Sequence, residues 1–211
     1  MECMNDYRNN GCQGGWPNDA WNFYATNGIV TGSGSDIGKG CKPNIFSDKK
    51  IADVSFSCTL NCESSEVLSA RHNETEIEQY LKDKHFGAGL VTTISSKDSN
   101  HINKIKLEMY KNGPVTALMF YPEGELKFTT DAELDLIYSN DAVYGKDGKL
   151  PNHAVRLIGW GKEKNTPYWL VANSWGKGWG RNGTVKIQQG TAMIDDLISF
   201  GKPDLSKKNT F

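Results

Sequence analysis

The sequence predicts an α+β protein of two lobes, and three observations carry this prediction. Helical patterns and glycine-rich loops fill the chain up to about residue 86. From residue 87 onward short apolar strands dominate instead. Two of those strands form a hairpin whose open end carries a histidine and an asparagine. Because segregated helices and strands are typical of α+β folds, we expect one lobe over 1–86 and another over 87–211, with a cleft between them.

The first lobe opens with a glycine-rich turn at Gly11–Gly15, in which backbone rather than side chain is exposed. A helix is predicted to follow, because Pro17 suits a first helical turn and Asn27-Gly28 is a stop signal. A second helix, short and charged, is predicted over 73–84.

The second lobe is predicted to hold five strands and one helix. The helix spans about 99–111 and ends at Asn112-Gly113-Pro114. A hairpin turn at 162–167, which contains an Asn-Thr-Pro signal, joins the third strand to the fourth. The strands are expected at 90–94, 115–121, 153–160, 168–172 and 184–187.

The open end of the hairpin carries the candidate catalytic residues. His153 begins the third strand and Asn173 directly follows the fourth. The carboxamide oxygen of Asn173 is therefore expected to accept the ring N–H of His153, fix its tautomer and aim the other ring nitrogen at a substrate. The pair would form the base and orienting group of a catalytic triad. The alternative is a purely structural histidine, buried and satisfied by Asn173.

The orienting group indicates which nucleophile such a site would use. A carboxamide orients an imidazole without fixing its charge, which suits a thiolate–imidazolium pair, whereas serine nucleophiles are usually served by a carboxylate. The pair therefore predicts a cysteine nucleophile. We expect the nearby Trp160 and Trp175 to keep the site dry.

Several sequence motifs occur in an order that a known family shares. They are Gly11-Cys12-Gln13-Gly14-Gly15, Tyr110-Lys111-Asn112-Gly113-Pro114-Val115, His153-Ala154-Val155, Gly159-Trp160-Gly161, Tyr168-Trp169, Asn173-Ser174-Trp175-Gly176 and Trp179-Gly180. Together they resemble the papain-like cysteine peptidases, and within them the cathepsin B branch, over about residues 3–190. The resemblance implies a papain-like two-lobe fold with a helical left lobe, incomplete here, and a β-barrel-like right lobe.

The resemblance also implies roles for individual residues. It assigns catalysis to His153 with Asn173. The exposed edge of the glycine turn would pair with an extended substrate peptide. The substrate-binding residues implied in this way are Gly14, Gly15, Ala154 and Trp175.

The nucleophile is where this sequence departs from the family. The family places it in a Cys-Gly-Ser-Cys-Trp type stretch, about 130–150 residues before the histidine and at the start of a central helix. Cys3 and Cys12 stand at that distance, but Cys12 lies in the glycine turn and Cys3 precedes a polar segment. No cysteine in the sequence is followed by tryptophan, and the upstream glutamine of an oxyanion hole is absent as well. We therefore expect no peptidase activity from the chain alone.

The other cysteine assignments also come from the resemblance. A zinc site built from Cys58-x-x-x-Cys62 with His72 is an alternative, but no second ligand pair at finger spacing follows, which favours disulfides. The pairs implied are Cys3 with Cys58 and Cys41 with Cys62, which leaves Cys12 without a partner. No metal and no cofactor are expected.

Five cysteines and two glycosylation sequons, at Asn73 and Asn182, are typical of a secretory-pathway protein. The resemblance implies a lysosomal, vacuolar or extracellular location. The first eight residues contain no apolar signal region. This combination predicts that a signal, a propeptide and the nucleophile helix belong to sequence missing from this chain.

Charge and hydropathy exclude other classes of function. The 24 basic and 25 acidic residues give a net charge of −1, which argues against a nucleic acid or an anionic membrane as partner. No apolar run approaches the roughly 20 residues that span a bilayer. A phosphate loop is rejected, because Ser33 and Gly40 stand where a glycine and a magnesium-binding hydroxyl belong.

Three hypotheses for function follow. The first is a cathepsin B-like endopeptidase acting on peptides or proteins, and open to protein protease inhibitors. Its cleft is expected to be open, because the interval that corresponds to the cathepsin B occluding loop, positions 42 to 57 inclusive, has only sixteen residues and no histidine. The second is a non-catalytic protein that binds peptides or inhibitors. The third is a truncated product that does not fold stably.

Overall fold

The computed structural model describes residues 14–32, 40–42, 58–62, 75–122, 135–143 and 145–207. The chain divides into two compact units, one of Met1–Val91 with Gly201–Phe211 and the other of Thr92–Phe200. The sequence-based division instead grouped residues 201–211 with the second lobe. Within the described ranges, no helix is both long and apolar enough to cross a membrane.

The first unit contains the helices α1 (Pro17–Thr26) and α3 (Glu76–Lys82). Helix α1 has proline in its first turn and ends before Asn27, as predicted. Helix α3 is shorter than its predicted span because Thr75 caps it. The Thr75 side chain accepts from the Glu78 backbone, and the Thr75 backbone N–H donates to the Glu78 carboxylate at 2.8 Å, which lowers the pKa of Glu78.

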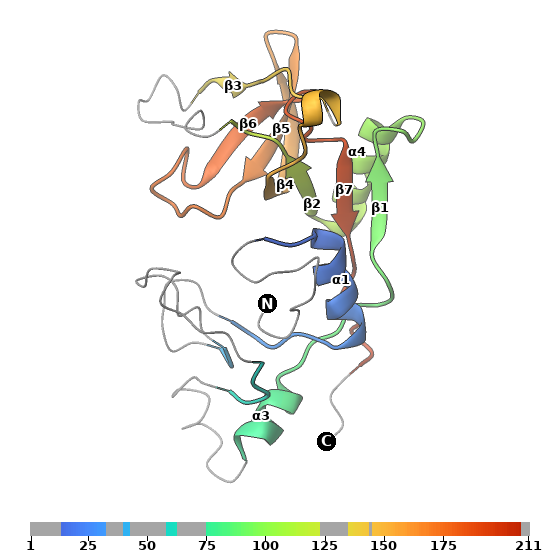
Figure 1. Ribbon diagram of the computed structural model, residues 1–211, viewed down its shortest axis with the longest axis vertical. Coiled ribbons are helices and arrows are strands. Elements are labelled where there is room, and N and C mark those ends of the chain that lie inside the picture. The colour runs from blue at the N-terminus through green and yellow to red at the C-terminus, as the bar shows by residue number, and fades with distance from the viewer. Residues whose placement is uncertain are drawn as a thin grey trace. The chain divides into compact units, whose positions relative to one another are not determined.

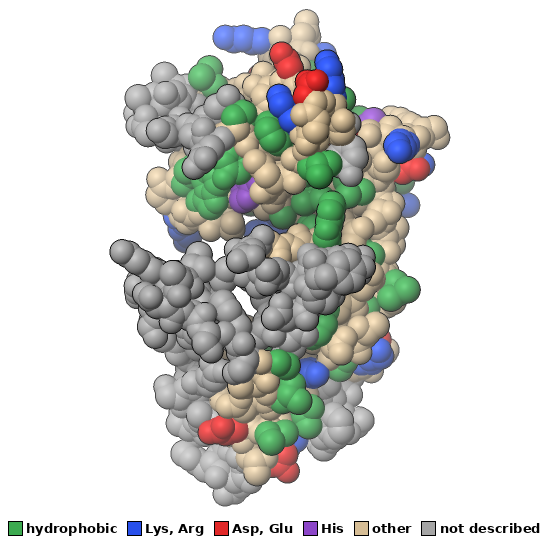
Figure 2. All heavy atoms as spheres, in the orientation of Figure 1, with side chains coloured by type: hydrophobic (Ala, Val, Ile, Leu, Met, Phe, Trp, Pro, Cys, Tyr) green, Lys and Arg blue, Asp and Glu red, His purple; other side chains and the backbone are tan. Residues whose placement is uncertain are grey.

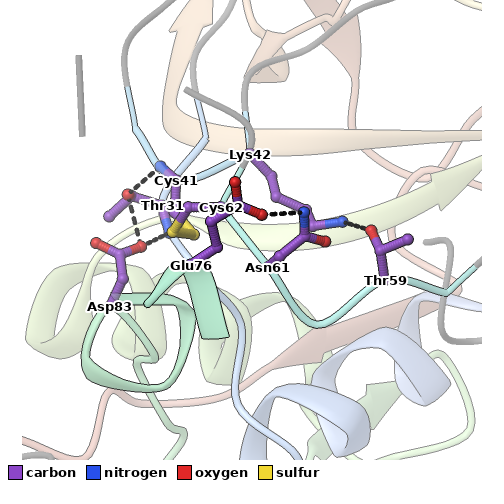
Figure 3. The surroundings of a disulfide bond; sticks show 8 residues. All are labelled: Thr31, Cys41, Lys42, Thr59, Asn61, Cys62, Glu76 and Asp83. Atoms are coloured by element: carbon purple, nitrogen blue, oxygen red, sulfur yellow. Dashed lines mark hydrogen bonds between the residues drawn. A yellow bond between two sulfur atoms is a disulfide. The ribbon is translucent and has the colours of Figure 1, made fainter. Parts of the chain in front are cut away.

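A buried disulfide joins Cys41 to Cys62, which confirms that predicted pair (Figure 3). Thr31 lies beside the disulfide and hydrogen-bonds to two segments that are distant in sequence. The Thr31 hydroxyl accepts from the Cys41 backbone N–H at 3.0 Å and donates to the Asp83 carboxylate at 2.7 Å. Tyr80 of α3 packs against the disulfide. The disulfide therefore joins two loop segments of the first unit, and α3 packs against it through Tyr80.

The remaining cysteines are only partly within the described ranges. Cys58 is disulfide-bonded, whereas its expected partner Cys3 lies outside the described residues, as does Cys12. The zinc alternative loses both of its thiolates, because Cys58 and Cys62 are each engaged in a disulfide.

Removing the Cys41–Cys62 bond is expected to lower the free energy of unfolding by about 3 kcal/mol, because the crosslink restricts the unfolded chain across 21 residues of sequence separation. The double variant Cys41→Ser, Cys62→Ser would be compared with wild type by urea unfolding. Both proteins are compared under non-reducing conditions, because Cys58 is disulfide-bonded as well and reduction would remove more than the Cys41–Cys62 bond. A loss under about 1 kcal/mol would contradict the prediction.

The second unit is built on one seven-stranded sheet (Figure 1). The strand order is β1-β7-β2-β4-β5-β6-β3, and every neighbouring pair is antiparallel except β3 with β6. A short 3₁₀ helix, η3 (Lys146–Gly148), lies in the connection before β4. The strands are β1 (Thr92–Ser95), β2 (Val115–Met119), β3 (Ile137–Tyr138), β4 (His153–Glu163), β5 (Thr166–Ala172), β6 (Thr184–Gln188) and β7 (Leu197–Phe200).

All five predicted strands are present, and two strands were missed. Strand β7 lies between β1 and β2 in the sheet and contains the buried Ile198 and Ser199. Its four residues are too few to show an alternating pattern. Strand β3 has two residues and pairs in parallel with the end of β6. Its existence depends on a neighbour almost fifty positions away, which no local pattern reveals.

Helix α4 (His101–Asn112) packs against β1, β2 and β4 and confirms the helix predicted there (Figure 1). Its apolar face buries Ile105 and Met109 in the main core. From the sheet, Trp169 of β5 is the largest fully buried side chain. On the face drawn in Figure 2, the Lys and Arg side chains of the described residues form no single basic field.

Asp195 is a buried carboxyl group in the loop between β6 and β7. It accepts the indole N–H of Trp169 at 3.2 Å and the backbone N–H of Gly190 at 2.8 Å. Burial raises the pKa of Asp195 above its ordinary 3.8; Asp196 adds to this, whereas the two hydrogen bonds and His101 oppose it. Asp195 therefore holds this loop to the core, although its burial disfavours the charged carboxylate.

Asp195→Asn is expected to gain stability relative to wild type as pH rises. The raised pKa means that the folded state binds the Asp195 proton more tightly than the unfolded state does. The protonated carboxyl therefore stabilises the fold fully below about pH 3.8, and this stabilisation is lost as pH rises through the raised pKa. Asparagine keeps an acceptor oxygen and carries no charge. Urea midpoints between pH 4 and pH 7 would measure the difference.

The exposed Asp141→Asn in the same unit is the control for general charge effects. A wild-type-minus-variant difference that does not change with pH, or that changes in the opposite direction, would contradict the Asp195 prediction.

Candidate active site

Strands β4 and β5 form the hairpin that carries the site. Its turn is tighter than predicted and centres on Lys164 and Asn165, both in the left-handed region with φ of 44° and 71°. Two consecutive residues of that kind make a turn whose twist matches that of paired strands. Arg156 pairs with Ala172 at the other end of the hairpin. Each functional side chain lies just beyond this last pair.

The register explains why His153 and Asn173 meet. Continuing the Arg156–Ala172 pairing would set Asn173 opposite Val155, two residues from His153 and on the same face of the sheet. Diagonal neighbours of this kind lie within reach of long side chains. The His153 Nε2 and the Asn173 Oδ1 are 2.9 Å apart. The predicted contact is present; its catalytic role stays a prediction.

The hydrogen bonds of Asn173 settle which ring nitrogen carries the proton. The Asn173 Oδ1 also accepts the backbone N–H of Ser174 at 2.7 Å. Because a backbone N–H can only donate, the atom facing it must be the carboxamide oxygen. His153 therefore donates through Nε2–H, and its Nδ1 is the nitrogen that can accept a proton.

Aromatic rings surround the imidazole. Trp175 lies at 5.1 Å between ring centroids and is tilted by 34° to the His153 ring, and Trp179 stands edge-on to Trp175 at 5.2 Å. Tyr121 makes edge-on contacts with His153 at 5.4 Å and with Trp175 at 5.5 Å. These rings pack beside the part-buried His153–Asn173 bond, and a hydrogen bond with less access to water is stronger.

The expectation that Trp160 shields the site is wrong. Trp160 lies seven positions beyond His153 along β4 (160 − 153), which corresponds to about 23 Å of strand. It pairs with Trp169 instead, and 42% of its surface is exposed. The prediction relied on proximity in sequence, but residues that are close in sequence lie far apart in an extended strand.

The other predicted site residues are located as follows. Ala154 lies in β4 with its exposed side chain on the opposite face from His153, so any contact it makes with a substrate there would come from the backbone. Gly14 and Gly15 are exposed residues of the first unit, directly before α1. Gly14 has φ of 111°, a conformation that favours glycine. Their predicted roles are not tested by these positions.

Of the two glycosylation sequons, only the one at Asn182 lies within the described residues. Asn182 is exposed in a turn with φ of 54°, so it is accessible to a modifying enzyme. Asn73 lies outside the described residues. Use of either sequon stays a prediction.

Sequence reasoning missed Tyr121 and Asn152 as members of the site. The Asn152 carboxamide accepts the backbone N–H of Tyr121 at 3.0 Å and donates to its carbonyl at 2.8 Å. Only the pairing of Met119 with His153 brings these residues together. In the sequence, Asn152 is only a polar residue between a proline and His153. That local pattern does not show that Asn152 lies beside the end of β2.

The chemistry of the described residues is that of a base with its orienting group. Nδ1 of His153 can take up a proton while Nε2–H stays bonded to Asn173. The three cysteines within the described ranges, Cys41, Cys58 and Cys62, are all disulfide-bonded. In those same ranges, no group of three or more His, Cys, Asp or Glu side chains could hold a metal ion.

An imidazole oriented by a carboxamide is the base unit of cysteine-type hydrolases. The chain belongs to one such group, the papain family of cysteine proteases, because residues 1–200 match the family model described as "Papain family cysteine protease".

Similar proteins agree with this assignment. A "Gut-specific cysteine proteinase" of Caenorhabditis elegans is 35% identical over 96% of this chain and 56% of its own length. "Cathepsin B-like cysteine proteinase 3" of the same organism is 35% identical over 90% of this chain and 46% of its own length. The chain thus spans about half the length of the curated relatives it matches.

The fold agrees with that of a solved structure, "proCathepsin B S9 from Trypanosoma congolense". The TM-score is 0.62 at 24% sequence identity, over 96% of this chain and 58% of the other. The fold is therefore papain-like, a mixed α+β fold with three α-helices and a seven-stranded sheet in the described residues.

Proposed function

We propose that this chain provides the base half of a cathepsin B-like cysteine peptidase that hydrolyses peptide bonds. The observation that carries the proposal is the 2.9 Å bond from His153 Nε2 to Asn173 Oδ1, at the open end of the β4–β5 hairpin. It leaves Nδ1 as proton acceptor, which is what a thiol nucleophile requires of its partner. Membership of the papain family supports the same function.

In the proposed mechanism His153 moves the proton twice. Nδ1 takes the proton of a cysteine thiol, which gives a thiolate and an imidazolium. The thiolate attacks the substrate carbonyl carbon, and Nδ1–H then protonates the leaving amine as the peptide bond breaks. His153 then takes a proton from water as its oxygen attacks the thioester carbon, the C–S bond breaks, and the carboxylic acid product leaves the restored thiolate–imidazolium pair. Asn173 accepts from Nε2–H throughout and keeps the ring oriented.

The nucleophile of this mechanism is proposed to lie outside the chain. No cysteine here precedes a tryptophan, and the three within the described ranges are disulfide-bonded. The same two observations favour the second candidate, a non-catalytic protein that binds peptides or protease inhibitors. The two candidates differ in whether a supplied thiol restores turnover.

The substrate class and the location are part of the proposal. The substrates are peptides or proteins, and protein inhibitors of proteases are further partners. Gly14 and Gly15 of the first unit, and Ala154 and Trp175 of the second, are proposed as residues that contact an extended substrate. A lysosomal or secreted location, with glycosylation at Asn182, suits a relative named as gut-specific.

A fusion experiment separates the two candidates. The chain alone is expected to show no turnover of a fluorogenic peptide. The same chain preceded by the nucleophile-bearing segment of a cathepsin B-like relative is expected to cleave it and to be blocked by an epoxide that alkylates thiols. Turnover by the chain alone that the epoxide blocks would contradict the assignment of the nucleophile. A folded but inactive fusion would favour the non-catalytic protein.

The fused form is expected to act as an endopeptidase. The sixteen positions 42 to 57 contain no histidine and are too few for a loop that blocks a cleft. A substrate blocked at its C-terminus should therefore be cleaved at least as fast as one with a free carboxylate. A marked preference for releasing C-terminal dipeptides would overturn this expectation.

A further inference from the structure

Strand β2 brings a second aromatic ring to the imidazole. Met119, the last residue of β2, pairs with His153 in register, so the two side chains leave the sheet on the same face. Tyr121 follows two positions later and returns to that face as the diagonal neighbour of His153. The contact between the rings, at 5.4 Å with an interplanar angle of 78°, is therefore built into the register.

The backbone of Tyr121 is fixed by the residue next to the histidine. Pro151 has no N–H to offer in this part of the ladder. The Asn152 carboxamide donates to the Tyr121 carbonyl at 2.8 Å in place of a backbone N–H, and it also accepts from the Tyr121 N–H at 3.0 Å. The Asn152 backbone N–H also donates to the Met119 carbonyl at 3.0 Å. The end of β2 and the residue before His153 are thus held together by hydrogen bonds.

Tyr121 also contacts the ring that flanks the imidazole. Trp175 lies close to His153 and to Tyr121 at 5.1 and 5.5 Å. Trp175 is 41% exposed, and Trp179 contacts it edge-on at 5.2 Å as well. The three rings contact one another pairwise, so a rotation of the imidazole away from Asn173 would change its contacts with both aromatic rings.

We propose that Tyr121, held by the Asn152 carboxamide, is a positioning residue that keeps the His153 imidazole in the orientation bonded to Asn173. This inference rests on the proposed function for its catalytic meaning, but its structural content can be tested without turnover. The ring rather than the hydroxyl does the positioning, because the contacts with His153 and Trp175 are ring contacts.

The test uses the full chain with ¹⁵N-labelled histidine. Long-range ¹H–¹⁵N spectra report the tautomer of His153, and the solvent exchange rate of Nε2–H reports opening of its bond to Asn173. Tyr121→Ala is expected to speed that exchange by about 3- to 10-fold, the ratio that corresponds to one aromatic pair. Tyr121→Phe should leave it within about twofold. Asn152→Ala should lie between the two.

The Trp169 indole N–H signal serves as the folding control, because that group is buried and bonded to Asp195. If Tyr121→Ala loses this signal, Tyr121→Leu replaces it. Equal exchange in wild type and the folded Tyr121 variants would overturn the positioning role and leave the proposed function intact. A wild-type His153 protonated on Nδ1 when neutral would overturn both.

Discussion

Replacing His153 with alanine in a fusion that carries the nucleophile will lower kcat/KM by at least about three orders of magnitude. The thiol then loses the group that takes its proton, and the leaving amine loses the group that protonates it. Asn173→Ala should cost less, about 10- to 100-fold, because the imidazole remains and only its orientation and tautomer are released. Both values would come from initial rates with the blocked peptide.

A surface histidine provides the matched control. His85 is exposed and lies in the first unit, so His85→Ala is expected to keep full activity. Retention of more than about a tenth of the activity by the folded His153 variant would contradict the assignment of the base. An Asn173→Ala variant as impaired as His153→Ala would indicate that the carboxamide does more than orient the ring.

The central contact of the site could be predicted because it lies within one hairpin. His153 and Asn173 are only twenty positions apart, and a single turn determines that they meet. The members that sequence reasoning missed are set by pairing between distant strands. Tyr121 and Asn152 meet across thirty-one positions through the β2–β4 register. Local periodicity contains no information on which strands become neighbours.

The same distinction applies to the fold. Helices α1 and α4 carry their own start or stop signals, such as Pro17 in one and Gly113 after the other, and both were predicted. Strand β7 has no such signal, yet it lies between β1 and β2 and buries Ile198. Its short sequence becomes a strand because two neighbours supply its hydrogen bonds. Tertiary context of this kind overrides weak local propensity.

Stability of the sheet and geometry of the site are linked through β5. Trp169 is fully buried in this strand, four positions before Asn173, and its indole N–H is bonded to Asp195. The strand pairs with β4 on one side and β6 on the other, so its position fixes the end from which Asn173 extends. Loss of packing at Trp169 should therefore weaken the whole unit rather than the site alone.

Trp169→Ala is expected to lower the free energy of unfolding by about 3–5 kcal/mol, because it leaves a large cavity and deprives the buried Asp195 of a donor. Trp160→Ala is the matched control, since Trp160 pairs with Trp169 in register but is 42% exposed, and it should cost less than about 1 kcal/mol. Urea unfolding of both variants measures the difference. Similar losses for the two tryptophans would contradict the burial of Trp169 as the cause.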